Sequence, residues 1–498
     1  MSSPAEVYSD MFPVPEYDPS MPRGGNTLEV NVNDQYTGHE FHYVYLTVCA
    51  FLVWMIIPGI GLLYSGLARR KSSLALLFQT LMVIAIVTFQ WMFWGYSLAY
   101  SRTGNAFIGN LDNFGLMGVR VAPSPGNAFL PEIIFCFYQL LFCAVTVQLV
   151  IGGAFERGGI LASLLFSFIW ATIVYCPVAN WTWNANGWLY NLGELDFAGG
   201  GPVHIASGCA SLAYALILGK RQVKSEIGRG RTKPHNASLV WLGTMLIWFG
   251  WFGFNGGSAL NASVRSLYVV FNTNTAASTG VLGWVLVDMV RNKGKFSVTG
   301  ACEGAIAGLV GITPAAGYVN FWLAALIGFL TGIVCSSLHD LNDLLNIDEG
   351  LDVFKLHGIG GMVGSFLTGI FADAPIGALD YELEIAGAIN GNGVQIGYNL
   401  AGIVAIAAYS FTVTSIILLV LRYIPGVGLR VSAEDEMMGL DAVHFADEEI
   451  GDWEYMKEAR STLNGHDGTE QSRRVSSAGS KEREVESTSA TSPGRAMV

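Results

Sequence analysis

Asp196-Phe-Ala-Gly-Gly-Gly-Pro-Val-His204-Ile-Ala-Ser-Gly208 places a carboxylate and an imidazole eight residues apart at the start of an otherwise apolar run. A second apolar run carries Lys355-Leu-His357-Gly-Ile-Gly-Gly361. A polar side chain inside hydrocarbon costs several kcal/mol unless it is paired or lines a cavity. One such histidine could simply hydrogen-bond a neighbouring helix. Two of them, each followed by glycines that let helices approach closely, favour a polar pathway through a membrane.

The composition is typical of a polytopic membrane protein. Of 498 residues, 52% are hydrophobic and 13% are charged, whereas soluble domains carry about 25% charged residues. The seven cysteines show no C-x-x-C or other metal-binding spacing, so they read as small core residues. We predict that the protein has no metal and no cofactor and that it is not an enzyme. The net charge of −12 lies largely in residues 425–498, with 15 acidic and 8 basic side chains, and gives no sign of nucleic-acid binding.

Eleven apolar runs approach the ~20 residues that a helix needs to cross a bilayer. They are approximately 43–66, 74–100, 131–154, 159–180, 202–219, 236–257, 269–290, 297–316, 319–338, 356–373 and 394–424. The sequence thus predicts an all-α membrane protein of eleven transmembrane helices. Residues 1–42 form an extracellular segment, 43–424 the membrane domain, and 425–498 a cytosolic tail that is disordered beyond about residue 460.

Basic residues set the orientation. The connections on one side of the membrane hold fourteen Lys and Arg residues, and the other side, with the N-terminal segment, holds four. The positive-inside rule then places the N-terminus outside and the C-terminus in the cytosol.

An odd number of runs, with one histidine in the fifth and one in the tenth, predicts two inverted repeats of five helices plus a final helix. In such folds the substrate site lies where the repeats meet, near the middle of the membrane. The alternative is that the two halves are not repeats, and that they look alike only because glycine-rich helices resemble one another.

Aromatic side chains gather near the predicted outer ends of three runs. Trp183 ends Tyr175-Cys-Pro-Val-Ala-Asn-Trp-Thr-Trp183, Phe254 and Ser258 lie in Gly-Trp-Phe-Gly-Phe-Asn-Gly-Gly-Ser, and Phe142 lies in the third run. Aromatic faces attract cations by ~2 kcal/mol or more when desolvated, so these rings with the serine hydroxyl would suit a small cation. An ordinary aromatic belt at the headgroup level is the alternative, and composition alone favours it.

The order of these motifs resembles a known family. They are Asp196-Phe-Ala-Gly-Gly-x-x-Val-His204, Gly-Ala-Phe-Glu156-Arg157, Gly-Trp-Phe-Gly-Phe254-Asn-x-Gly-Ser258, Gly-Ala-x-Glu-Gly-Ala-Ile-Ala-Gly-Leu-Val-Gly-Ile-Thr-Pro314 and Asp352-Val-Phe-x-x-His357-Gly. From about residue 43 to 441 the chain resembles the Amt/Mep/Rh ammonium transporters, and within them the twin-histidine branch of the fungal Mep permeases. That branch is associated with scavenging at low ammonium and with ammonium sensing.

The resemblance implies a role for each site residue. Trp183, Phe142 and Ser258 would recruit ammonium (or methylammonium) at the outer face, Phe142 and Phe254 would gate the pore, and His204 and His357 would line the conduction path. Asp196 would support the recruitment site and its electrostatics, and Gln139 lies near the pore. The family also implies a plasma-membrane homotrimer with one pore per subunit.

The tail resembles the family's regulatory C-terminus through Gly428-Leu-Arg430-Val-Ser-x-Glu-Asp-Glu-x-x-Gly-Leu-Asp441. Further on, Arg473-Arg-Val-Ser476 has the form of a kinase substrate, so Ser476 is a possible phosphorylation site and a kinase a possible partner.

Three other functions are compatible with parts of this pattern. Paired intramembrane histidines can ligate haem in an oxidoreductase, although the adjacent glycine contacts leave little room for it. The chain could sense ammonium with little transport. An Rh-type gas channel is the nearest competitor, and Trp183 argues against it because Rh proteins generally lack that tryptophan.

Overall fold

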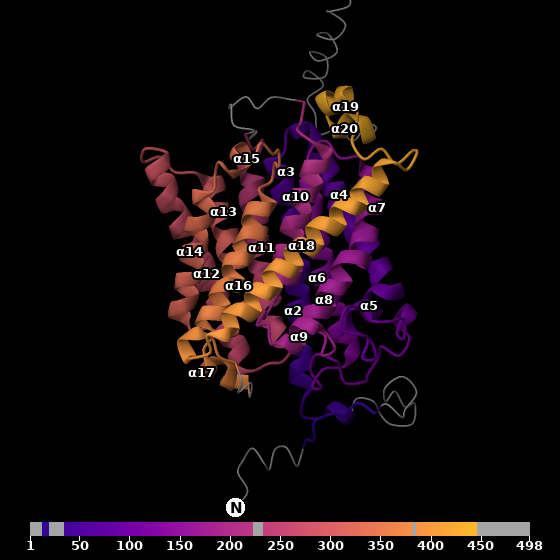
Figure 1. The fold of residues 1–498 in the computed structure, drawn as a ribbon, viewed down its shortest axis with the longest axis vertical. Coiled ribbons are helices and arrows are strands. Elements are labelled where there is room, and N and C mark those ends of the chain that lie inside the picture. Colours follow the sequence, from indigo (N-terminus) through magenta and orange to yellow (C-terminus); the bar gives the residue numbers. More distant parts are fainter. Residues whose placement is uncertain (1–11, 19–33, 223–232, 381–384, 446–498) are drawn as a thin grey trace, which may run out of the picture. The chain divides into compact units, whose positions relative to one another are not determined.

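Helices make up the regular structure in the part of the chain that is described. The computed structural model describes residues 12–18, 34–222, 233–380 and 385–445, and in these ranges only two isolated β-bridges occur and no strand. Long helices pack side by side, as Figure 1 shows. The predicted all-α class is confirmed.

Each of the eleven predicted runs is helical. Within the described residues, seven segments are long and apolar enough to cross a membrane: Glu40–Leu67, Arg70–Tyr100, Glu132–Ala154, Ile160–Leu192, Gly200–Leu218, Ala237–Ala259 and Val394–Arg422. A bent pair, Phe354–Phe371 with Ala374–Asp380, turns by 97°. The other runs form α12 (Val264–Arg291) and the shorter α13 (Val298–Ile312) and α14 (Phe321–Ser337). Eleven as the number of membrane crossings stays a prediction.

Several of these spans consist of shorter helical pieces. The bounds of the pieces and of the remaining main helices are α2 (Glu40–Trp54), α3 (Ile56–Leu67), α4 (Ser73–Gln90), η3 (Trp91–Gly95), α5 (Tyr96–Tyr100), α6 (Glu132–Ile151), α7 (Ile160–Trp170), η6 (Ala171–Tyr175), α8 (Cys176–Trp183), α9 (Trp188–Leu192), η7 (Gly200–Ile205), α10 (Ala206–Leu218), α11 (Ala237–Gly256), α15 (Leu341–Leu344), η9 (Phe354–Ile359), α16 (Gly360–Phe371), α17 (Ala374–Gly377) and α18 (Val394–Arg422). Four of the pieces, η3, η6, η7 and η9, are π-helical turns, which are rare and often occur at functional sites.

Glycines let the helices approach closely. A methyl group on Gly243 of α11 would lie 2.5 Å from the backbone nitrogen of Leu63 on α3, and one on Gly59 would lie 2.9 Å from Ile247. The two backbones are therefore in direct contact. Close contact of this kind replaces the hydrophobic effect as a source of helix association in lipid.

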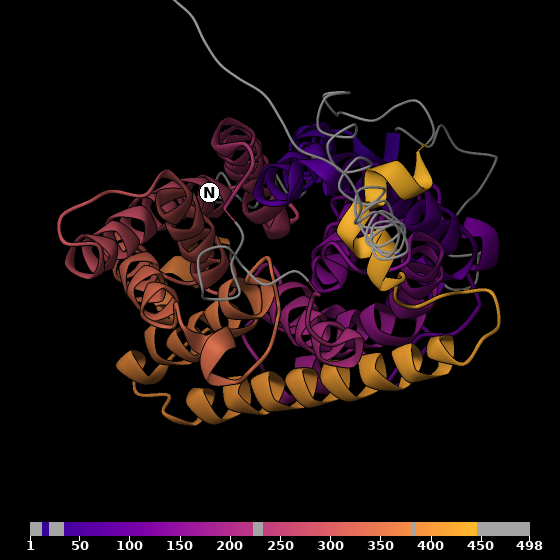
Figure 2. The same ribbon diagram turned by 90° about the horizontal axis from the view of Figure 1, so that it is seen from above.

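Helix α18 binds the two parts of the bundle together (Figure 2). Its Thr414 accepts a hydrogen bond from Trp170 Nε1 of α7 at 2.8 Å, and its Ser410 donates to the carbonyl of Ala206 at the start of α10 at 2.6 Å. Toward its other end, Asn399 donates to the carbonyl of Ser365 on α16 at 3.0 Å. The helix thus contacts both histidine-bearing segments of the chain.

A buried arginine joins the loops at one end of the bundle. Arg157 is fully buried and donates to the carbonyl of Gly219, at the end of α10, and to that of Asp348. Beside it, Arg221 pairs with both Asp348 and Glu156. The loops that contain Arg157, Arg221 and Asp348 are therefore in contact. The count of basic residues had placed these loops on the same side of the membrane.

The segment around α19 (Ala433–Met438) and α20 (Leu440–His444) docks at this end. Asp441 accepts hydrogen bonds from two backbone N–H groups in the first turn of α4, at 3.0 and 2.8 Å, and a carboxylate is favourable at that positive end of the helix dipole. Glu436 accepts from the backbone of Gln222 at 2.6 Å and pairs with Arg430 at 2.8 Å. The predicted tail motif therefore packs on the loops. Residues 446–498, with Ser476, lie outside the described residues.

Candidate transport site

Two phenylalanines lie between Trp183 and the first histidine. Phe142 on α6 and Phe254 on α11 stack with their ring centroids 4.0 Å apart and an interplanar angle of 19°, and both side chains are buried. At this distance the rings are in van der Waals contact, so no molecule fits between them.

Trp183 lies beside this ring pair at the end of α8. Its ring meets that of Phe142 edge to face, with centroids 6.0 Å apart, and remains partly exposed. Ser258 lies in the short turn after α11, where its hydroxyl donates to the carbonyl of Phe254 at 2.8 Å and approaches the hydroxyl of Tyr138 at 3.4 Å. The structure therefore brings the predicted recruitment residues to one place.

Asp196 organises the start of the helix that carries the first histidine. Its carboxylate accepts three backbone hydrogen bonds, from Gly199, Gly200 and Gly201, at 2.8, 2.8 and 2.6 Å. Gly199 has φ +113°, a conformation that favours glycine. Burial raises the pKa of the Asp196 carboxyl, and the three N–H groups partly offset that rise. Trp183 Nε1 donates to the Asp196 carbonyl at 3.2 Å, which links the aromatic group to this turn.

The two histidines meet in the interior. His204 lies in η7 and His357 in η9, and their Nδ1 atoms are 3.2 Å apart, in hydrogen-bond contact. One imidazole must donate this bond and the other accept it, so the outward Nε2 atoms have opposite roles: one accepts and the other donates. The His204 Nε2 is buried with no hydrogen-bond partner among the described residues.

Glycine contacts make the histidine contact possible. A methyl group on Gly208 of α10 would fall closer than 2.5 Å to the backbone of Gly358 in η9. These glycines are among those that follow each histidine in the sequence, where close approach of the helices was predicted. Both histidines also lie in π-helical turns, which no sequence pattern indicated.

Trp251 was not predicted as a site residue. Its ring stacks on that of His204, with centroids 5.3 Å apart at 20°, and its Nε1 donates to the Thr313 hydroxyl at 3.0 Å. The only signal in the sequence was its place three residues before Phe254, one helical turn away on the same face.

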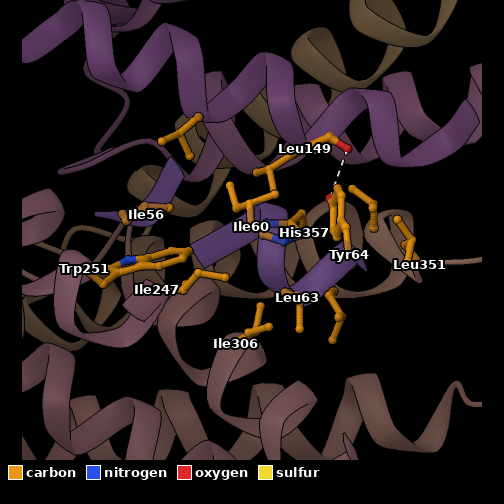
Figure 3. A pocket seen from close by; sticks show the side chains of 13 residues that line it. Ile56, Ile60, Leu63, Tyr64, Leu149, Ile247, Trp251, Ile306, Leu351 and His357 are labelled. Carbon is orange, nitrogen blue, oxygen red and sulfur yellow. Dashed lines mark hydrogen bonds between the residues drawn. The ribbon is translucent and has the colours of Figure 1, made fainter. Parts of the chain in front are cut away.

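A cavity lies next to His357 and Trp251. It has a volume of about 30 Å³, enough for roughly two water-sized molecules by the 10–15 Å³ that each needs. Figure 3 shows His357 and Trp251 with apolar side chains around it, and Tyr64, whose hydroxyl donates to the Leu149 carbonyl at 3.3 Å. An apolar cavity of this size suits a small neutral molecule better than a hydrated ion.

Gln139 lies on α6 one turn before Phe142. Its side chain is 7% exposed, and its Oε1 has no hydrogen-bond partner among the described residues. Its predicted place near the pore stays a prediction.

No metal site accompanies these groups within the described ranges: no three His, Cys, Asp or Glu side chains gather closely enough to hold an ion. All seven cysteines lie within the described residues, where each is buried and none forms a disulfide.

Comparison with known proteins agrees with this arrangement. A family model described as Ammonium Transporter Family matches residues 44–450. Ammonium transporter MEP2 of Saccharomyces cerevisiae is 49% identical over 438 residues, covering 87% of this chain and 86% of its own length. Ammonium transporter 1 of Schizosaccharomyces pombe is 47% identical and covers 86% of each chain. The crystal structure of Candida albicans Mep2 has a TM-score of 0.79 and 48% identity, covering 84% of this chain and 92% of that one. This chain belongs to the ammonium transporter family.

Proposed function

We propose that the chain carries ammonium across the plasma membrane by separating the cation into ammonia and a proton. The cation is recruited at Trp183, Phe142 and Ser258, loses its proton, and passes as NH3 between Phe142 and Phe254 to the histidine pair. The observation that carries this proposal is the buried Nδ1 contact between His204 and His357, which lies directly behind the closed ring pair.

Electrostatics favour a neutral passenger. Burying an isolated charge in an apolar path costs several kcal/mol per ion, which the stacked rings and the apolar cavity do not offset. Ammonium can shed that charge by giving up a proton, whereas K+, of similar size, cannot. The same arrangement that admits ammonia therefore excludes K+.

The histidine pair supports the passage of ammonia. Of the two Nε2 atoms, one accepts a hydrogen bond and the other donates, and NH3 does both. The pair can also relay a proton, and Asp196 lies at the start of the same helix. We infer that the proton follows the ammonia by a separate hydrogen-bonded route, so that the net movement is that of NH4+.

The assembly and orientation follow from family membership and charge. We infer a homotrimer with the N-terminus outside and the docked C-terminal segment in the cytosol. That segment contacts loops near the inner end of the path, so a kinase acting on Ser476 would regulate transport and any ammonium sensing through it. The Ser476→Ala variant should change uptake under nitrogen starvation and leave pore selectivity unchanged; unaltered uptake would contradict this.

Uptake of labelled methylammonium in cells that lack their own ammonium transporters tests the function. We expect saturable uptake that ammonium competes away, strongly reduced or altered in selectivity by His204→Ala. The matched control is His444→Ala, which removes an exposed imidazole. Uptake that does not saturate would favour an Rh-type gas channel. No uptake by a well-expressed wild type, also after deletion of the residues beyond Asp441, would favour a sensor. A Soret band in the purified protein would favour the haem alternative.

A further inference from the structure

A second carboxylate repeats the relation between Asp196 and His204. Glu349 precedes His357 by eight residues, as Asp196 precedes His204. Each acid lies in the loop before a π-helical turn, η7 in one case and η9 in the other, and each turn carries its histidine. The two acids approach the histidine pair from opposite ends of the path, because Asp196 contacts Trp183 and Glu349 neighbours the Asp348 of the cytosolic loops.

The contacts of Glu349 tie the two histidine-bearing segments together. Its Oε2 accepts from the backbone N–H of Phe354, the first residue of η9, at 3.2 Å. Its Oε1 accepts from the hydroxyl of Ser211 on α10 at 3.4 Å. The side chain is 2% exposed, so water does not replace these bonds when they are lost.

Charged and polar groups around Glu349 act on its ionisation in opposite directions. Asp352 from its own loop opposes its ionisation, while the backbone N–H groups of Val353 and Phe354 and the ammonium of Lys355 from η9 favour it. The phenol of Tyr64 from α3 lies nearby and is uncharged at neutral pH. Burial dominates and raises the pKa of Glu349 to about 7. Glu349 therefore changes charge in the physiological range.

We propose that Glu349 is a positioning residue for His357, which holds η9 against α10 while it is ionised and releases that hold when it is protonated. The inference rests on the proposed function, in which the histidine contact conducts ammonia. Protonation removes the negative acceptor of the Phe354 N–H and weakens the bond from Ser211, so the His357 ring loses its fixed position. Transport is then faster above neutral pH than below it.

The test is ammonium uptake into proteoliposomes at equal inner and outer pH, varied from 5.5 to 8.5. With a pKa of about 7 the ionised fraction of Glu349 falls about tenfold between pH 8 and pH 6, and the wild-type rate should follow it. Glu349→Gln should be slow with a flat profile, and Glu349→Asp should keep a pH-dependent profile. The control Asp343→Asn removes an exposed carboxylate from the neighbouring helix α15 and should behave as wild type.

A Glu349→Gln protein with the wild-type pH profile overturns the proposal. If Glu349→Gln is inactive at every pH, Glu349→Asp decides: a retained profile supports the role, and a flat profile or no activity refutes it. Absence of uptake by the wild type at all pH values would instead refute the proposed function, so the two failures are distinguishable.

Discussion

Replacing Gly208 by alanine should break the histidine contact without touching either ring. The added methyl group falls closer than 2.5 Å to the backbone of Gly358, and backbone atoms of a packed turn cannot move aside as a flexible side chain does. Normal contact needs about 3.5 Å, so α10 and η9 must separate by at least about 1 Å. The Nδ1 atoms of His204 and His357 then move from 3.2 Å to beyond hydrogen-bond distance.

The size of the effect follows from what is lost. Overpacking of a tight contact costs about 1–3 kcal/mol of stability, so the thermal midpoint of the purified protein should fall. Loss of a hydrogen bond of about 1–1.5 kcal/mol at the conducting pair should lower maximal uptake about five- to thirteenfold. The apparent affinity for methylammonium should change little, because the outer residues Trp183 and Ser258 are unaffected.

Labelled methylammonium uptake in transporter-deficient cells, normalised to surface protein, measures this loss. Gly397→Ala is the matched control, because it makes the same substitution within helix α18 at a position with open space around it. It should be neutral in both assays. A Gly208→Ala protein with wild-type uptake and wild-type stability would refute the role of close backbone contact in placing the histidines.

Three further substitutions test other parts of the site. Trp183→Leu removes a cation–π contact worth about 0.5–2 kcal/mol and should raise the KM for methylammonium roughly 2- to 30-fold with a smaller change in maximal rate; an equal loss in maximal rate and no change in KM would contradict recruitment. Asp196→Asn puts an amide where three N–H groups donate and should abolish uptake, whereas retained uptake would show that the acceptor is dispensable. Asp441→Asn weakens the cap on α4 by about 0.5–2 kcal/mol and should speed limited proteolysis after residue 425; equal cleavage rates would mean that the segment docks through Glu436 and Arg430 instead.

The sequence predicts the helices well because their apolar runs are long and the breaks between them are polar. All eleven runs are helical, and the side chains singled out for the outer group and the interior pair lie together as expected. Their roles in transport stay predictions until they are tested. The two glycine-flanked histidines were informative because the cost of burying a polar group leaves few explanations for them.

Other features had little or no signal in the sequence. The π-helical turns depend on the local packing around His204 and His357, and apolar periodicity cannot distinguish them from α-helix. Trp251 lies in a stretch rich in aromatic residues, which did not distinguish it from its neighbours. Its contact with His204 arises only when distant helices meet. Glu349 lies in a polar loop, where a carboxylate is an ordinary residue and predicts no special role. Only the folded chain shows that it is buried and bonded to the start of η9.

The position of α18 has a consequence for how the protein is made. At 1.5 Å per residue its 29 residues extend about 43 Å, more than the ~30 Å of hydrocarbon, and the helix crosses the bundle obliquely in Figure 1. It is hydrogen-bonded to α7, α10 and α16, yet among the described helices it is the last long one to leave the ribosome. The two histidine-bearing segments can insert and meet before that point, but the hydrogen bonds from α18 hold them together only when synthesis is nearly complete. A chain that stops before residue 394 would lack these hydrogen bonds. Polar groups of α7, α10 and α16 would then be exposed to lipid, and membrane quality control could recognise the chain.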